Sequence, residues 1–314
     1  MAGHHLPRHA GKELTRGNMA LLFAFLLLLL LPQDALAWGP GVHMAIGNNV
    51  LAHLHLFAPA LASVLASHPE QYLYGCLSAD IFIGKGCTYT PTHSHNWDMG
   101  RALLRQADSA ETQAYAYGYL SHLAADVIAH NYFVPNMLGF SAGRGKFAHT
   151  YVEMLADLQV ECPRKQASRI FRVPHPDADD TLVATMGQKK VPFFIKKRIF
   201  RQSLRLVEKR TYKNSLRVFR DLLPFSSKKV FISEAISYAQ DLVFDLLQNP
   251  MRSPVLECDP IGSSNLSQIR RFQRRQRSFY TAHGDGLIFP LDTRLEACLK
   301  EHGGLHEEFT RFSA

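Results

Sequence analysis

The sequence has only five cysteines in 314 residues, and no two of them form a Cys-x-x-Cys pair. This absence excludes a zinc ribbon and other structural metal sites built from cysteine thiolates. The odd number leaves at least one cysteine unpaired or in an intermolecular bond. Cys76 and Cys87 could pair across a short loop, but the sequence alone leaves the pairing open.

No apolar run is long enough to cross a bilayer. The longest, 19–31, has 13 residues, whereas a spanning helix needs about 20. This length suits the apolar core of a signal peptide, and Ala35 and Ala37 supply the small residues of a cleavage site. We therefore expect residues 1–37 to be a signal peptide, Trp38 to begin the mature chain, and the protein to be exported, either periplasmic or secreted.

The alternation of β-branched and polar residues that marks strands is scarce, and no internal repeat is present. Apolar residues instead recur at helical spacing. The sequence predicts an all-α, multi-helix single domain over 38–250, followed by a basic and partly irregular segment over 251–314. The predicted helices cover 45–56, 102–108, 112–131, 146–160, 193–209, 233–247 and 294–301. Clusters of Pro and Gly predict loops at 84–91, 135–145 and 174–180, and 253–276 is predicted to be a linker or irregular.

Positive charge exceeds negative charge, with a formal net charge of +8. The excess is concentrated in 189–229, which holds 14 Lys and Arg residues, and in the run Arg-Arg-Phe-Gln-Arg-Arg-Gln-Arg at 270–277. Such surfaces attract phosphate groups of lipids or nucleic acids. The amphipathic part, 193–209, could settle on an anionic membrane surface. It could equally be a helix that faces the core and has a solvated side.

Three polar residues are spaced four apart in an apolar segment: His122, Asp126 and His130. At 100° per residue they share one face of a helix. Three aligned polar groups on a buried helix cost several kcal/mol unless they are paired or bind metal, so the row favours a metal site over ordinary core histidines. His149 and Glu153 repeat the spacing, and the alternative for them is a surface ion pair.

Three further candidates stand alone in the sequence. Asp80 is an acid in an apolar segment and could also be a helix N-cap. His95 lies in a loop beside His93, and the sequence does not decide between the two as a ligand. Cleavage after Ala37 would put the free amine of Trp38 five residues from His43, and an amine, a carbonyl and an imidazole can bind a metal together. The alternative is that Trp38 merely packs.

Taken in order, these residues resemble the zinc-dependent phospholipase C family, which is related more distantly to the P1/S1-type nucleases. The resemblance covers 38–157. The motifs that carry it are Trp38 with His43, Asp80, His95-Asn96-Trp97-Asp98, His122-x3-Asp126-x3-His130, and His149-x3-Glu153. It implies an all-α enzyme with up to three zinc ions in a cleft.

The resemblance also implies a ligand set for each ion. The amine and carbonyl of Trp38, with His43 and Asp126, would hold one zinc ion. A second would be held by Asp80, His95, His122 and Asp126, with Asp126 bridging the two ions. The third would be held by His130, His149 and Glu153. In the secreted lipases of that family the aspartate and the following histidine are six positions apart, whereas Asp126 and His130 are four positions apart. We therefore expect the helix to run regularly through His130.

The expected activity is zinc-dependent hydrolysis of the phosphodiester bond of a phospholipid, with Asp80 as the catalytic base and a phospholipid or membrane surface as the partner. No specific nucleic-acid partner is expected. The first alternative is a single-strand nuclease or 3′-nucleotidase, which would need aromatic platforms for bases; the candidates are Tyr115, Tyr117, Tyr132 and Phe133. The second alternative is a zinc-binding protein without catalysis.

Overall fold

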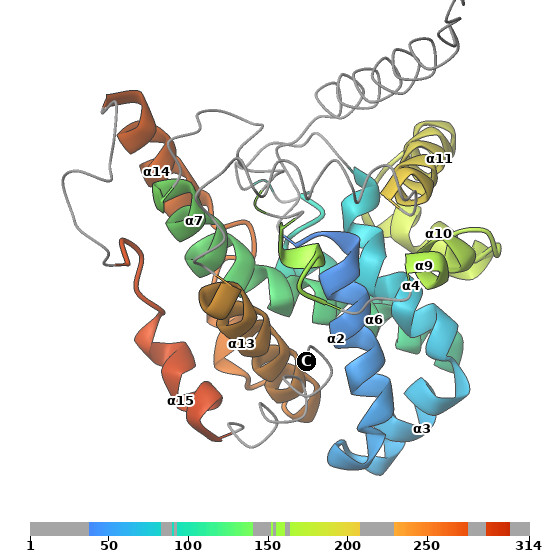
Figure 1. Cartoon of the computed structure of the whole chain (residues 1–314). Helices are drawn as coiled ribbons and strands as arrows, with labels where there is room; N and C mark the ends of the chain where they lie inside the picture. Colours follow the sequence, from blue (N-terminus) through green and yellow to red (C-terminus); the bar gives the residue numbers. More distant parts are fainter. Residues whose placement is uncertain are drawn as a thin grey trace, which may run out of the picture.

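The computed structural model describes residues 38–82, 90, 93–140, 152, 155–160, 164–207, 229–275 and 287–301 (Figure 1). The expected signal peptide, His149, Glu153 and most of the helix expected over 146–160 lie outside these residues. Within the described residues all regular structure is helical, so the predicted all-α fold is confirmed. None of the described helices is long and apolar enough to cross a membrane.

The amino-terminal half holds the helices that form the centre of the molecule. In chain order they are α2 (Pro40–Ala52), η1 (Leu54–Leu56), α3 (Pro59–Ser67), α4 (Pro69–Ser78), η2 (Ala79–Phe82), α5 (Trp97–Gln106), α6 (Ala110–Ile128), η3 (Ala129–Phe133) and α7 (Val134–Phe140). The carboxy-terminal half adds α9 (Arg164–Ile170), α10 (Pro176–Thr185), α11 (Lys190–Val207), α13 (Lys229–Gln248), η5 (Pro254–Glu257), α14 (Ser263–Arg275) and α15 (Thr293–Glu301).

Four of the described helices begin with a proline. Pro40, Pro59, Pro69 and Pro176 each stand in the first turn of a helix, where the missing N–H has no intrahelical partner to lose. The loop predicted over 174–180 is therefore wrong, because α10 begins at Pro176. The loop predicted over 135–145 is wrong at its start, because α7 continues through Pro135 to Phe140.

The long helix α6 is the central element, and its middle is buried on every side. A capping box begins it, in which the Ser109 and Thr112 side chains each bind the other's backbone N–H. Two glycines let α4 cross it at backbone contact. A Cβ at Gly75 would lie 2.1 Å from the carbonyl oxygen of Tyr115, and one at Gly118 would lie 1.9 Å from that of Tyr72. This approach brings the end of α4, and hence η2, against the middle of α6.

The segment after residue 250 packs against the helices of the amino-terminal half. The expectation of a linker or irregular structure over 253–276 is wrong, because α14 occupies Ser263–Arg275 and packs on η3 and α7. The Asn136 side chain, in α7, accepts the N–H groups of Ile288 and Phe289 and donates to the Phe289 carbonyl. The chain beyond the predicted end of the domain therefore contributes to the core.

The three cysteines that the structure describes are buried thiols. Cys76 is free, so it does not form the disulfide with Cys87 that the sequence left open; Cys87 itself lies outside the described residues. Burial raises the pKa of the Cys76 thiol to about 12. It therefore stays protonated and acts as a small apolar side chain that faces Gly47 of α2.

Gly118→Ala should be strongly destabilising. The added methyl meets a backbone carbonyl, which cannot move away by changing a rotamer, so α4 and α6 must separate at a cost of about 3 kcal/mol or more. The matched control is Gly47→Ala in α2, where the nearest atom is the flexible end of the Leu73 side chain at 2.9 Å. Thermal unfolding of both variants checks this. Equal melting temperatures would contradict the close crossing.

Candidate metal centre

Five side chains from four separate segments meet at one point inside the molecule. His43 comes from α2, Asp80 from η2, His95 from the turn before α5, and His122 and Asp126 from α6. All five are buried. The regular part of α6 puts His122 and Asp126 on one face, as their spacing predicts. These five of the nine expected site residues are therefore brought together by the fold.

The carboxylate of Asp126 lies between two groups of nitrogen atoms. Its Oδ1 is 3.3 Å from Nε2 of His43. Its Oδ2 is 3.1 Å from Nε2 of His95 and 3.2 Å from Nε2 of His122. The two oxygens of one side chain therefore face different partners, as a carboxylate that bridges two cations must.

Asp80 closes the second group. Its Oδ1 is 3.3 Å from Nε2 of His95 and 3.7 Å from Nε2 of His122, and the two imidazole nitrogens are only 3.0 Å apart. One ligand atom each from Asp80, His95 and His122 lies within 4.8 Å of the others, and the same holds for His43, His122 and Asp126. Sets of this kind, with nitrogen and carboxylate oxygen, are those that zinc takes in catalytic sites.

Buried polar atoms without hydrogen-bond partners show that the group fits a cation. Nε2 of His43 and both carboxylate oxygens of Asp80 and of Asp126 have none, although all are removed from solvent. Buried polar groups in proteins are almost always satisfied. Divalent cations placed among these atoms would give them partners, so the residues present fit zinc.

The electrostatics of the cluster indicate the same need for positive charge. Burial alone would lower the pKa of His95, but the close carboxylates of Asp126 and Asp80 outweigh it and raise the pKa to about 9. Burial likewise opposes ionisation of Asp126, yet the neighbouring His122 holds the pKa of that carboxyl well below its usual range. Without a metal, a proton on an imidazole therefore supplies the positive charge that two buried carboxylates require.

Backbone carbonyls set which nitrogen of each histidine is available. Nδ1 of His122 donates to the Cys76 carbonyl at 2.9 Å, and Nδ1 of His130 donates to the Pro260 carbonyl at 2.6 Å. A carbonyl only accepts, so both Nδ1 atoms carry the hydrogen and both Nε2 atoms keep a lone pair. This is the arrangement in which outer hydrogen bonds orient metal-binding histidines.

The two histidines of the 93–95 loop have different surroundings. The ring of His95 enters the cluster, whereas Nδ1 of His93 accepts the backbone N–H of His95 at 3.1 Å. The Tyr119 hydroxyl donates to the Ser94 carbonyl at 2.5 Å and ties this loop to α6. His93 thus shapes the loop that presents His95.

Trp38 is anchored beside the cluster. Its indole Nε1 donates to the carbonyl of Ala125, the residue before Asp126, and its ring stacks on Phe133 with centroids 4.5 Å apart. The alternative reading, that Trp38 packs, therefore holds for the side chain. The packing also fixes its backbone next to α6, so it is compatible with a role for the nitrogen of Trp38.

Asp157 is a functional candidate that the sequence analysis missed. Its carboxylate accepts the backbone N–H of Gly41 at 3.1 Å and that of Val42 at 2.9 Å, and so caps the first turn of α2 from a distant part of the chain. His43 is the next residue. The sequence did contain a clue to Asp157. Like Asp80, it is an acid within an apolar stretch, and it lies four positions after Glu153.

The helix does not run regularly through His130, so that expectation is wrong. A π-helical stretch, η3, follows α6 at Ala129, and the N–H of Val134 binds the carbonyl of Ala129, five residues back. His130 is buried, with its ring centroid 6.2 Å from that of His95. It therefore lies beside the five-residue cluster rather than within it. Its expected co-ligands, His149 and Glu153, lie outside the described residues.

A turn near the end of the described chain positions His130, and the sequence analysis did not identify it. The Asn131 side chain donates to the Asp259 carbonyl at 2.7 Å, and Asn265 donates to the Asn131 carbonyl at 2.8 Å. Gly262 has a φ of +62°, and a Cβ there would lie 2.5 Å from Cβ of His130. The pair Pro260 and Gly262 signals a tight turn, but nothing in the sequence says which helix it meets.

Comparison with known proteins gives one match. The family described as zinc dependent phospholipase C matches residues 42–212, which is more than half of the chain. This range includes His43, Asp80, His95, His122 and Asp126, and it ends before α13 and the turn that contacts His130. No curated protein and no solved structure matched. The chain belongs to the zinc-dependent phospholipase C family, as the order of its motifs predicted.

Proposed function

We propose that this protein is an exported, zinc-dependent hydrolase that cleaves the phosphodiester bond of a phospholipid head group. Membership of the family supports a phospholipase C-like hydrolase. The observation that carries the proposal is the position of Asp126, whose two buried oxygens face two separate groups of imidazole nitrogens. A bridging carboxylate suits a centre with more than one metal ion, which is typical of enzymes that cleave phosphate esters.

The proposed ligands follow from which atoms lie together. His43 and Asp126 would hold one zinc ion together with the amine and carbonyl of Trp38. A second ion would be held by Asp80, His95, His122 and Asp126, with Asp126 shared. For a third ion, His130 offers Nε2 because its Nδ1 is bound to Pro260, and His149 and Glu153 complete its set.

Bound zinc would supply Lewis acidity toward the phosphate oxygens and would lower the pKa of an attacking water. The protein's own residues would accept the proton and orient the ligands. Asp80, whose carboxylate oxygens have no hydrogen-bond partner, is proposed to take the proton of that water on an oxygen. The Cys76 carbonyl holds His122 so that only Nε2 faces the centre. The burial of the cluster keeps bulk water from screening these charges.

The nuclease alternative is less well supported by the aromatic residues. Tyr115 and Phe133 are buried, and Phe133 already stacks on Trp38. Tyr132 is buried with its ring against Phe231, at a centroid distance of 5.2 Å. Stacking platforms for bases must be accessible. Of the four aromatic residues that the sequence suggested as platforms for bases, Tyr117 is partly exposed and the other three are buried.

One experiment separates the three functions. The zinc content of the mature protein is measured, and the same preparation is assayed on phosphatidylcholine and on single-stranded DNA. Release of a phosphorylated head group supports the proposal, and its rate should rise when a short-chain phospholipid forms micelles. Release of nucleotides alone would support the nuclease. Bound zinc without either activity would support a binding protein.

An extra residue before Trp38 should reduce metal binding. The proposed ligand is a free amine, whereas a peptide nitrogen has no lone pair to offer a zinc ion. A mature protein that begins with one added alanine should bind about one zinc ion less and lose most of its activity. Its control carries the same alanine after Ala314. Equal zinc content and equal rates in the two proteins would refute the role of the amine.

Asp126→Asn should remove more than one zinc ion, because one charge that serves two ions is lost while the size is kept. Hydrolysis should fall at least about 100-fold, since even residues that only orient ligands cost 10–100-fold. The control is Asp98→Asn, which makes the same change at an exposed acid in α5. Zinc is measured by elemental analysis of dialysed protein. Full zinc content in the variant would exclude a bridging role.

Gly262→Ala should weaken zinc binding by about 10–100-fold at the site that includes His130, because the methyl would displace His130 from the Pro260 carbonyl. Gly187→Ala is a matched control. Gly187 also has a positive φ, +58°, but no atom lies within 4 Å of a Cβ there. Backbone strain should cost each variant about 1 kcal/mol of stability, and Gly262→Ala should lose more because its methyl also meets the backbone carbonyl of His130. Identical zinc titrations of the two variants would show that the turn does not act on the metal centre.

A further inference from the structure

Helix α11 has two apolar faces, and only one of them is covered. Phe193, Phe200 and Leu204 are buried against the rest of the molecule. The opposite face exposes Val191 (72%), Phe194 (49%), Ile195 (56%) and Ile199 (46%). These are four of the nine large hydrophobic side chains that are exposed among the described residues. The reading of this segment as a helix that faces the core therefore holds for one face, and the other face is apolar as well as exposed to solvent.

The charge on α11 has one sign. Between Lys190 and Val207 the helix holds six Lys and Arg residues and no Asp or Glu. Two of the cations are paired with acids of α10. Lys197 lies 2.5 Å from Asp179, and Lys190 lies 2.8 Å from Asp180. The exposed Arg198 lies between Ile195 and Ile199 in sequence, so positive charge borders the apolar side chains of the outer face.

The helix is connected directly to the candidate metal centre. Phe193 packs on Phe82, with ring centroids 5.7 Å apart, and Lys196 lies over the same ring at 5.7 Å. Phe82 is the last residue of η2, the short helix that carries Asp80. The next ring on α11, Phe194, is 5.4 Å from Phe193 and belongs to the exposed face. Roughly one helix diameter, about 10 Å, therefore separates the exposed face from the Asp80 turn.

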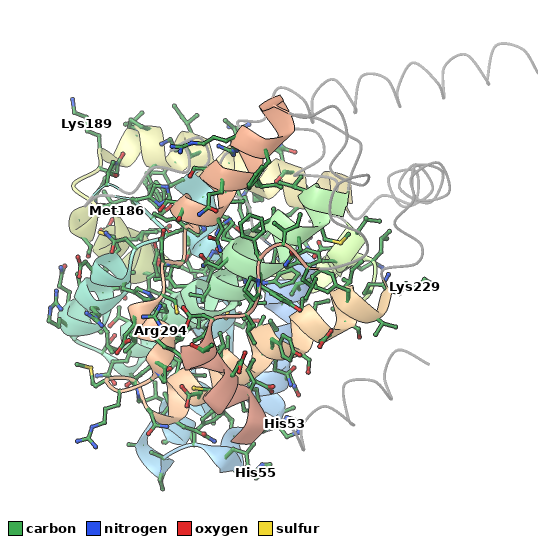
Figure 2. All side chains as sticks on the ribbon, turned by 90° about the vertical axis from the view of Figure 1, so that its left-hand side faces the viewer. His53, His55, Met186, Lys189, Lys229 and Arg294 are labelled. Carbon is green, nitrogen blue, oxygen red and sulfur yellow. The ribbon has the colours of Figure 1, made fainter. Side chains whose placement is uncertain are left out.

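A second cationic helix lies at the same end of the molecule. Figures 1 and 2, which differ by a turn about the vertical axis, both show α14 and α11 at the upper end, and Figure 2 labels Lys189 beside α11. In α14, Phe272 is 38% exposed and follows Arg270 and Arg271. Positive charge with exposed apolar side chains is thus concentrated at one end.

We propose that the outer face of α11 docks on the surface of an anionic phospholipid bilayer, with Val191, Phe194, Ile195 and Ile199 inserted at the level of the head groups. Apolar side chains bordered by Lys and Arg are the pattern of helices that lie in a membrane interface. The inference deepens the proposed function and rests on it, because docking there would hold the Asp80 turn close to the lipid substrate.

Charge favours a membrane over two other occupants. If a second copy of the chain covered this face with its own α11, cations that no acid of α10 pairs, such as the exposed Arg198, would be brought together from the two helices, which is unfavourable. A nucleic acid would satisfy the cations, but its phosphates would not bury the exposed isoleucine and phenylalanine side chains. An anionic bilayer offers both negative charge and an apolar layer.

The test compares the mature protein with a double variant, Phe194→Ser with Ile195→Ser. Binding is measured by co-sedimentation with vesicles of phosphatidylcholine alone and of phosphatidylcholine with phosphatidylglycerol. The mature protein should bind the anionic vesicles more tightly, and the double variant should bind them at least about tenfold more weakly. Met251→Ser, which removes a 77% exposed methionine elsewhere, should bind like the unchanged protein.

Hydrolysis of a phospholipid below its micelle threshold separates docking from catalysis. The kcat/KM of the double variant on this monomeric substrate should equal that of the unchanged protein, while its rate on anionic vesicles falls. If neither protein hydrolyses the monomer but the double variant still loses vesicle binding, docking stands and the proposed function fails. Equal vesicle binding by the two proteins would overturn the proposal. So would a dimer in solution that the double substitution dissociates.

Discussion

The buried carboxylate of Asp126 is the constraint around which this structure is organised. A negative charge removed from water is unstable unless cations or hydrogen-bond donors surround it, and here imidazoles approach it from three segments. Each segment must therefore be held at a defined distance from α6. Individual hydrogen bonds hold them there, and several of these bonds end on a backbone carbonyl. The metal centre is thus assembled largely by the main chain.

Three carbonyls show how the main chain sets the centre. Those of Cys76, Ala125 and Pro260 accept hydrogen bonds from His122, Trp38 and His130. A carbonyl can only accept, so the partner nitrogen is fixed as the donor and the orientation of each ring follows. The Cys76 carbonyl can reach His122 only because glycines let α4 and α6 touch. Packing deep in the core therefore decides which nitrogen faces the metal centre.

The sequence predicted those parts of the site that depend on local periodicity. His122 and Asp126 share a helix face because they are four apart, and the isolated acid in an apolar segment identified Asp80. His130 shows the limit. Its place depends on a π-helical stretch and on a carbonyl 130 residues away, and neither leaves a period in the sequence. The prolines at 135 and 176 led to wrong loop predictions for a related reason. A proline in the first turn of a helix is tolerated, whereas a proline in the interior breaks the helix. The all-α class could be predicted because it needs only the repeat of apolar residues.

Trp38 and the start of α2 are held in place by contacts that do not involve the proposed metal ligand, the nitrogen of Trp38. The indole of Trp38 is bound to α6 and stacked on Phe133, and Asp157 caps the first turn of α2. These contacts use the side chain of Trp38 and the N–H groups of Gly41 and Val42, and none uses the nitrogen of Trp38. They hold the side chain of Trp38 and the first turn of α2, and neither set of contacts depends on a peptide bond before Trp38. Under the proposed processing, cleavage would change what the nitrogen can bind without changing where it lies.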